Sequence, residues 1–149
     1  MSSERENVYL LNLAQANQAE QNLEYDTARE LLNGAIQQQP GRADAYLQMA
    51  VLLYRTGDYQ GAIDQLDSAV SSGNLTEKNM DSVSVEQMHF IKGNCYIELK
   101  DYANAVRELQ TAVNTQGAST DSYRSFAIAL ANDGKIKEAQ STLETLQVS

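Results

Sequence analysis

Cysteine and proline are nearly absent from the sequence, which contains one residue of each. With Cys95 alone, the chain can form neither an internal disulfide nor a thiolate metal cluster, so cysteine usage leaves the redox compartment open. The single proline, Pro40, leaves long stretches free to be helical, because proline interrupts the hydrogen bonding of a helix. Frequent alanine, glutamine and leucine residues favour an all-helical protein.

Long apolar runs are also missing. No stretch approaches the length needed to cross a membrane, and the start, residues 1–6, lacks the apolar core of a signal peptide. The sequence therefore predicts a cytoplasmic protein with no membrane insertion. An extracytoplasmic fragment whose signal or lipid anchor had been removed would show the same features.

Basic residues are few, since 11 Lys and Arg against 20 Asp and Glu give a formal net charge of −9. The basic residues are scattered, whereas binding to nucleic-acid phosphates needs clustered positive charge. We therefore expect no nucleic-acid partner. The simplest interpretation of the acidic excess is a solvated surface, and a docking face for basic partners is the alternative.

One pattern occurs four times along the chain. In its clearest copy, residues 57–70, Gly57 and Asp58 end one helix, Tyr59 supplies an apolar side chain, and Ala62 begins a helical spacing of small and apolar residues. The corresponding alanines lie at positions 28, 62, 105 and 139, so the steps between copies are 34, 43 and 34 residues. A recurrence of this length indicates a repeat array.

The 34-residue step and the residues at fixed positions resemble the tetratricopeptide repeat family. The family has a small residue in its first helix, an aromatic residue before the second helix and a small residue early in the second helix. These positions fall on Ala16, Ala50, Gly93 and Ala127, on Tyr25, Tyr59 and Tyr102 with Ile136 in the last copy, and on Ala28, Ala62, Ala105 and Ala139. We predict that the small residues let paired antiparallel helices approach closely.

The resemblance implies an all-α fold, a right-handed α-solenoid of four helix-turn-helix repeats with about eight helices. We expect a single domain over residues 1–149, with repeats at approximately 9–42, 43–76, 86–119 and 120–149 and a first helix that begins near Val8 after a frayed start. The 43-residue step predicts an insertion at approximately 74–85, a polar surface loop that can also lengthen the next helix. Repeats 2 and 3 therefore meet at the expected weak joint.

Residues able to carry catalysis are scarce. His89, the only histidine, occupies a first-helix position that the family fills with an aromatic core residue, so we expect a packed or half-buried ring. Cys95 has no second thiol, and we expect no reactive thiolate. Lys92 replaces a large apolar residue, which predicts either a rotated helix or a charged end that reaches water. We expect no enzymatic activity, no cofactor and no metal site.

First helices line a concave groove in tetratricopeptide arrays, and the register predicts which residues of this chain face it. They are Leu10, Leu13, Asn17, Leu47, Gln48, Val51, Tyr54, Phe90, Ile91, Asn94, Arg124 and Ile128. A face so apolar is typical of a site for an apolar or amphipathic peptide or helix, with the asparagines bonding its backbone and Arg124 a carboxylate. The alternative is that some of these side chains pack against neighbouring helices.

One subgroup of the family holds acidic chaperone tails with a clamp of cationic and asparagine side chains. Asn17 matches its first asparagine, but Leu13, Gln48, Gln87 and Ile91 occupy the other positions, so that ligand is disfavoured. The sequence thus predicts a non-enzymatic scaffold or adaptor that binds a protein or peptide partner in the groove. The second hypothesis is self-association, in which the groove or an uncapped end receives another copy and gives a homo-oligomer.

Overall fold

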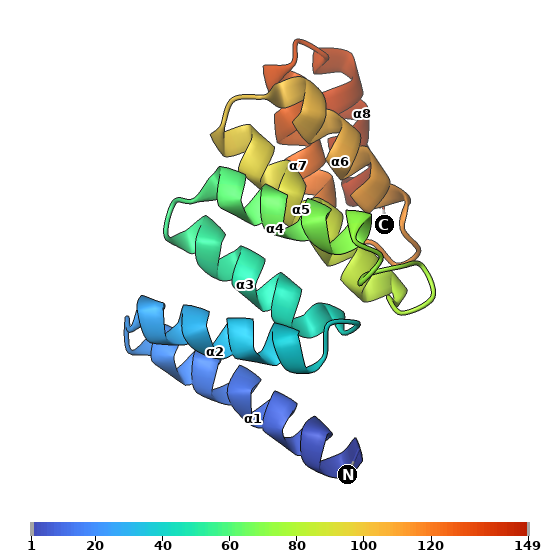
Figure 1. Ribbon diagram of the computed structural model, residues 1–149. Coiled ribbons are helices and arrows are strands. Elements are labelled where there is room, and N and C mark those ends of the chain that lie inside the picture. Colours follow the sequence, from blue (N-terminus) through green and yellow to red (C-terminus); the bar gives the residue numbers. More distant parts are fainter. Residues whose placement is uncertain (1, 149) are drawn as a thin grey trace.

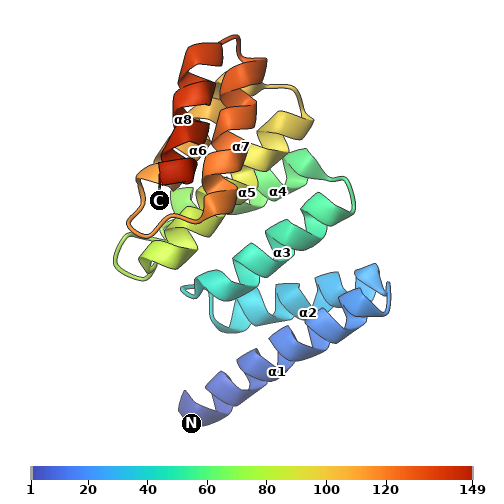
Figure 2. The ribbon, with the colours of Figure 1, turned by 180° about the vertical axis from the view of Figure 1, so that it is seen from behind.

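The computed structural model describes residues 2–148, which form eight α-helices and no strand. The helices are α1 (Ser2–Gln21), α2 (Tyr25–Gln38), α3 (Ala43–Arg55), α4 (Tyr59–Ser71), α5 (Ser82–Glu98), α6 (Tyr102–Asn114), α7 (Thr120–Asn132) and α8 (Ile136–Val148). Successive helices pair as hairpins, and the hairpins stack side by side from α1–α2 at one end to α7–α8 at the other (Figures 1 and 2). The predicted all-α solenoid of four repeats is confirmed.

Each hairpin turns through one residue with a positive φ. This residue is Gly57 in the second repeat and Gly134 in the fourth, with φ of 87° and 83°. The same position is Leu23 in the first repeat and Lys100 in the third, with φ of 63° and 62°. A side chain in this left-handed region is strained, because its Cβ crowds the following carbonyl oxygen. The shape of the turn is thus common to all four repeats, and glycine suits it best.

The small side chains of the repeat pattern in the first two repeats are fully buried. Ala16, Ala28, Ala50 and Ala62 are all 0% exposed and belong to one apolar core. In the third repeat the crossing residue is Gly93, and a Cβ placed there would lie 2.8 Å from Cδ2 of Leu109 on α6. That spacing leaves no room for even a methyl group, so the packing of α5 on α6 requires glycine.

The aromatic position before each second helix is less uniform. Tyr59 and Tyr102 are half-buried, but Tyr25 is 36% exposed and Ile136 is 53% exposed. The side chain at this position is therefore more buried in the two middle repeats than in the first and last repeats.

Residues 2–7 are helical, so the prediction that the first helix begins near Val8 after a frayed segment is wrong. Glu6 forms an ion pair with Arg42, just before α3, and the Arg42 guanidinium lies 4.5 Å from the centre of the Tyr9 ring. The Tyr9 hydroxyl accepts a hydrogen bond of 3.1 Å from the backbone N–H of Ala45. These contacts join the first turns of α1 to the start of the second repeat, which stabilises them as helix.

The predicted insertion is divided between a connection and a longer helix. Residues 72–81 join α4 to α5, and α5 has 17 residues where α3 and α7 have 13. The connection is not wholly a polar surface loop, because Leu75 is 1% exposed and packs into the core. The Asn79 side chain closes it by donating to the carbonyl of Asn74 at 2.7 Å and accepting from the N–H of Thr76 at 2.8 Å.

Replacing Leu23 with glycine should stabilise the protein. Leu23 is 71% exposed, so its loss removes little buried apolar area while it relieves the strain of a positive φ. Glycine also has more conformational freedom in the unfolded chain, and the entropic cost of ordering it offsets part of the benefit. We therefore expect a net gain of roughly 0.5–1 kcal/mol in the free energy of unfolding. Urea unfolding measures it, and a loss of stability in Leu23→Gly would show that the leucine makes contacts that outweigh the strain.

Candidate functional site

A concave cavity opens between α1, α3 and α5, on the side formed by the first helices of three repeats. Its volume is about 670 Å³. It is lined by Leu13, Ala14, Asn17, Glu20, Asp44, Leu47, Gln48, Val51, Arg55, Gln87, Phe90 and Ile91. We name this cavity the groove. Helical spacing places these residues on one face of each helix, at intervals of three or four residues.

Seven of the twelve residues predicted to face the groove line it. They are Leu13, Asn17, Leu47, Gln48, Val51, Phe90 and Ile91. Leu47 and Ile91 are only 6% and 9% exposed, so both mainly pack between helices, which is the alternative that the sequence left open. Leu13, Val51 and Phe90 are half-buried and present apolar surface to the opening.

The other five predicted residues lie outside the groove lining. Leu10, Arg124 and Ile128 are exposed, and Asn94 is half-buried. Tyr54 packs edge-on against Tyr59 with ring centres 5.4 Å apart, so the turn of the second repeat holds it. The groove is therefore formed by the first three repeats, and the α7 residues do not contribute to it.

Charged side chains that the sequence did not predict stand at the ends of the groove. Glu20 is 7% exposed and its carboxylate lies 2.8 Å from the guanidinium of Arg55, which joins α1 to α3. Asp44 at the other end of α3 pairs with Arg42 at 3.1 Å. Glu20 follows Asn17 by three residues and Arg55 follows Val51 by four, so same-face spacing was the signal that would have found them.

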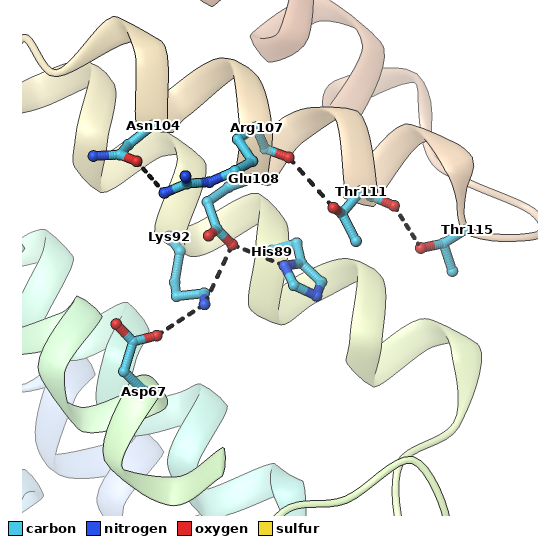
Figure 3. A network of polar contacts seen from close by, with 8 residues as sticks. All are labelled: Asp67, His89, Lys92, Asn104, Arg107, Glu108, Thr111 and Thr115. Carbon is cyan, nitrogen blue, oxygen red and sulfur yellow. Dashed lines mark hydrogen bonds and ion pairs between the residues drawn. The ribbon is translucent and has the colours of Figure 1, made fainter. Parts of the chain in front are cut away.

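A second polar cluster lies outside the groove lining, where α5 contacts α4 and α6 (Figure 3). The Lys92 ammonium lies 2.9 Å from a carboxylate oxygen of Asp67 on α4 and 3.2 Å from one of Glu108 on α6. Nδ1 of His89 lies 2.8 Å from the same oxygen of Glu108. We name these four residues the joint cluster, because they connect the second repeat to the third across the insertion.

The structure contradicts one of the two alternatives for Lys92, the one in which its charged end reaches water. Lys92 is 8% exposed, and its charge is balanced by two carboxylates that lie on neighbouring helices. A buried ammonium is tolerated only when it is paired in this way. The His89 side chain is 19% exposed, which agrees with the expected half-buried ring.

The pKa values of Lys92 and Glu108 are shifted in the directions that favour their charged forms. Burial alone would lower the pKa of Lys92, but the hydrogen bond to Asp67 and the charge of Glu108 outweigh it and raise that pKa. Burial alone would raise the pKa of Glu108, but the hydrogen bond with His89 and the charge of Lys92 outweigh it and lower that pKa. Lys92 and Glu108 therefore stay ionised at neutral pH.

The Cys95 thiol has no means of becoming a nucleophile. Its side chain is fully buried, and burial, followed by the charges of Glu98 and Asp58, raises its pKa to about 12. Only the thiolate is reactive, so the thiol is inert at physiological pH.

Within residues 2–148 no group of three or more His, Cys, Asp or Glu side chains is arranged to hold a metal ion. The same residues include no helix that is both long and apolar enough to span a membrane.

Comparison with known families identifies the repeats. Residues 15–75 and residues 86–117 each match a sequence model described as tetratricopeptide repeat. The chain belongs to the tetratricopeptide repeat family. Members of this family are protein-interaction scaffolds, and the groove of this chain lies on the first-helix face of its tetratricopeptide repeats.

Solved structures of other proteins share the fold. MamA from Desulfovibrio magneticus RS-1 is 14% identical, with a TM-score of 0.71 over 96% of this chain and 73% of MamA. YrrB, described as a TPR protein with an unusual peptide-binding site, is 23% identical, with a TM-score of 0.68 over 88% of this chain and 63% of YrrB. BtubC from P. vanneervenii is 12% identical, with a TM-score of 0.77 over 93% of this chain and 61% of BtubC. A search of curated proteins found no match.

The Glu108→Gln variant should show a free energy of unfolding that changes less than that of the parent protein as the pH falls into the acid range. Because the fold lowers the pKa of Glu108 below 4.5, its ionised form stabilises the protein at neutral pH, and this stabilisation is lost as the pH falls through the lowered value. We expect the variant to lose about 1–3 kcal/mol at neutral pH and to approach the parent protein in stability as the pH falls below the lowered pKa of Glu108. Urea unfolding at a series of pH values from neutral to acid measures both the loss of stability at neutral pH and its decrease in acid.

The matched control is Glu30→Gln, which removes an exposed carboxylate from α2. Its stability should follow that of the parent protein across the same pH range. If Glu108→Gln and Glu30→Gln gave the same pH profile, the joint cluster would contribute nothing to the folded state.

Proposed function

We propose that this protein is a non-enzymatic scaffold that binds a peptide or helix of a partner protein in the groove. The observation that carries the proposal is the set of apolar side chains, Leu13, Val51 and Phe90, that three different first helices present to one open cavity. Apolar surface gathered in a concavity is the common property of peptide-binding sites. A helix in such a groove is bound through apolar residues spaced by three or four.

The polar residues of the groove favour an apolar or amphipathic ligand over an acidic tail. All five clamp positions, Leu13, Asn17, Gln48, Gln87 and Ile91, line the groove, and none of them is cationic. The one basic side chain in the lining, Arg55, is already paired with Glu20. A carboxylate-rich ligand would therefore gain little charge pairing and would face Asp44 as well.

Catalysis has no support in the same region. The groove lining contains neither histidine nor cysteine. His89 lies outside the groove lining and is hydrogen-bonded to Glu108, and the buried Cys95 thiol is protonated. A converging base and nucleophile, which hydrolytic and transfer enzymes need, is thus not formed by these residues.

The proposal is tested by selecting ligands from a displayed random-peptide library and measuring their affinity for a groove variant. Val51→Asp places a carboxylate among the apolar side chains of the groove, and we expect it to weaken the selected peptides by at least about tenfold, or about 1.4 kcal/mol. Titration calorimetry measures the affinity. Leu47 is unsuited to this purpose because it is only 6% exposed, so a substitution there would disturb the core as well as the groove.

Val70→Asp is the matched control, since Val70 is 44% exposed on α4 and lies outside the groove. It should leave the affinity unchanged. Circular dichroism should show the same helicity in both variants. Equal affinities of the two variants would refute the groove as the binding site.

A further inference from the structure

The C-terminal end of the array exposes a side chain whose counterparts are buried. Leu143 on α8 is 45% exposed, whereas Leu32, Leu66 and Leu109, at the same repeat position, are all 0% exposed. In those three repeats the first helix of the next repeat packs against the helix that carries the leucine, as α3 does on α2 and α7 on α6. Ile136, seven residues before Leu143 and on the same face of α8, is 53% exposed.

The N-terminal end shows the complementary exposure. Leu11 on α1 is 54% exposed, whereas its counterparts Ala45, Met88 and Ser122 are 0%, 6% and 0% exposed. Ala45 shows what these counterparts contact, because it packs with Ala35 of the preceding repeat. Val8 lies three residues before Leu11 on the same face of α1 and is 44% exposed. The helices α1 and α8 thus present the two halves of one inter-repeat contact, at opposite ends of the array (Figure 1).

We propose that copies of this chain associate head to tail, with α1 of one copy stacked on α8 of the next. The argument is continuity with the packing that the chain already makes three times between its own repeats, in which the first helix of one repeat packs on the second helix of the repeat before it. Because the two faces differ, each copy in a pair keeps one face free, and the assembly is open-ended. This inference does not depend on the groove, since neither Leu11 nor Leu143 lines it.

The composition of α1 predicts a weak contact. Gln15 and Gln18 stand where the second repeat has the buried residues Met49 and Leu52. The apolar part of the N-terminal face is therefore limited to Val8 and Leu11, and the area that it removes from water is smaller than between repeats of one chain. Association should rise with protein concentration, as mass action requires.

Sedimentation equilibrium of the whole chain over a concentration series tests the proposal. The average mass should rise above the 16.4 kDa of one chain as the concentration increases. Leu11→Lys and Leu143→Lys should each remain monomeric at every concentration, because a buried ammonium without a partner opposes stacking. Leu23→Lys, a change to a 71% exposed leucine in a turn, should associate like the parent protein.

Mixing the two end variants decides the geometry. Leu11→Lys keeps an intact α8 face and Leu143→Lys keeps an intact α1 face, so an equimolar mixture should form a one-to-one dimer and nothing larger. A parent protein that stays monomeric throughout, end variants that associate as it does, or a mixture that forms no dimer would each overturn the proposal. Circular dichroism of the end variants confirms that they are folded, and the affinity of Val51→Asp for selected peptides reports on the groove separately.

Discussion

The close approach of paired helices at small side chains is the constraint on which the rest of this structure depends. In the third repeat, α5 and α6 come together at Gly93, where the Leu109 side chain of α6 occupies the space that a methyl group would need. Fixing the separation of each pair also fixes how the next pair can pack upon it. The curved face of first helices, and with it the groove, follows from four repetitions of this contact.

The joint between the second and third repeats combines that packing with buried charge. A lysine stands where apolar residues pack in the equivalent helices, as Met49 does in α3 and Phe126 in α7. Its ion pairs with Asp67 and Glu108 join three helices at the place where the inserted residues interrupt the period. Removing one partner of such a buried pair is costly, because it leaves the other charge buried and unpaired. The α5 helix that they hold also presents Phe90 and Ile91 to the groove.

The fold was predictable from the sequence because the signal is local and repeated: Tyr59 and Ala62 recur in register, and each copy confirms the others. The burial of Lys92 was not predictable from the sequence, because the carboxylates that balance its charge lie on other helices. The helical start of α1 was missed for the same reason, since Arg42 and Ala45 stabilise it from 36 residues away. Helical spacing found the groove residues at the centre of α3, but the extent of the groove depends on the angle between repeats, which no spacing encodes.

The stability of a variant with a larger side chain at a helix crossing measures the central constraint most directly. Ala62 is fully buried in α4, whereas Val70 in the same helix is 44% exposed. The account predicts that Ala62→Leu lowers the free energy of unfolding by about 1–3 kcal/mol, because the added atoms force α3 and α4 apart, and that Val70→Leu changes it little. Equal unfolding midpoints in urea for Ala62→Leu and the parent protein would contradict the account.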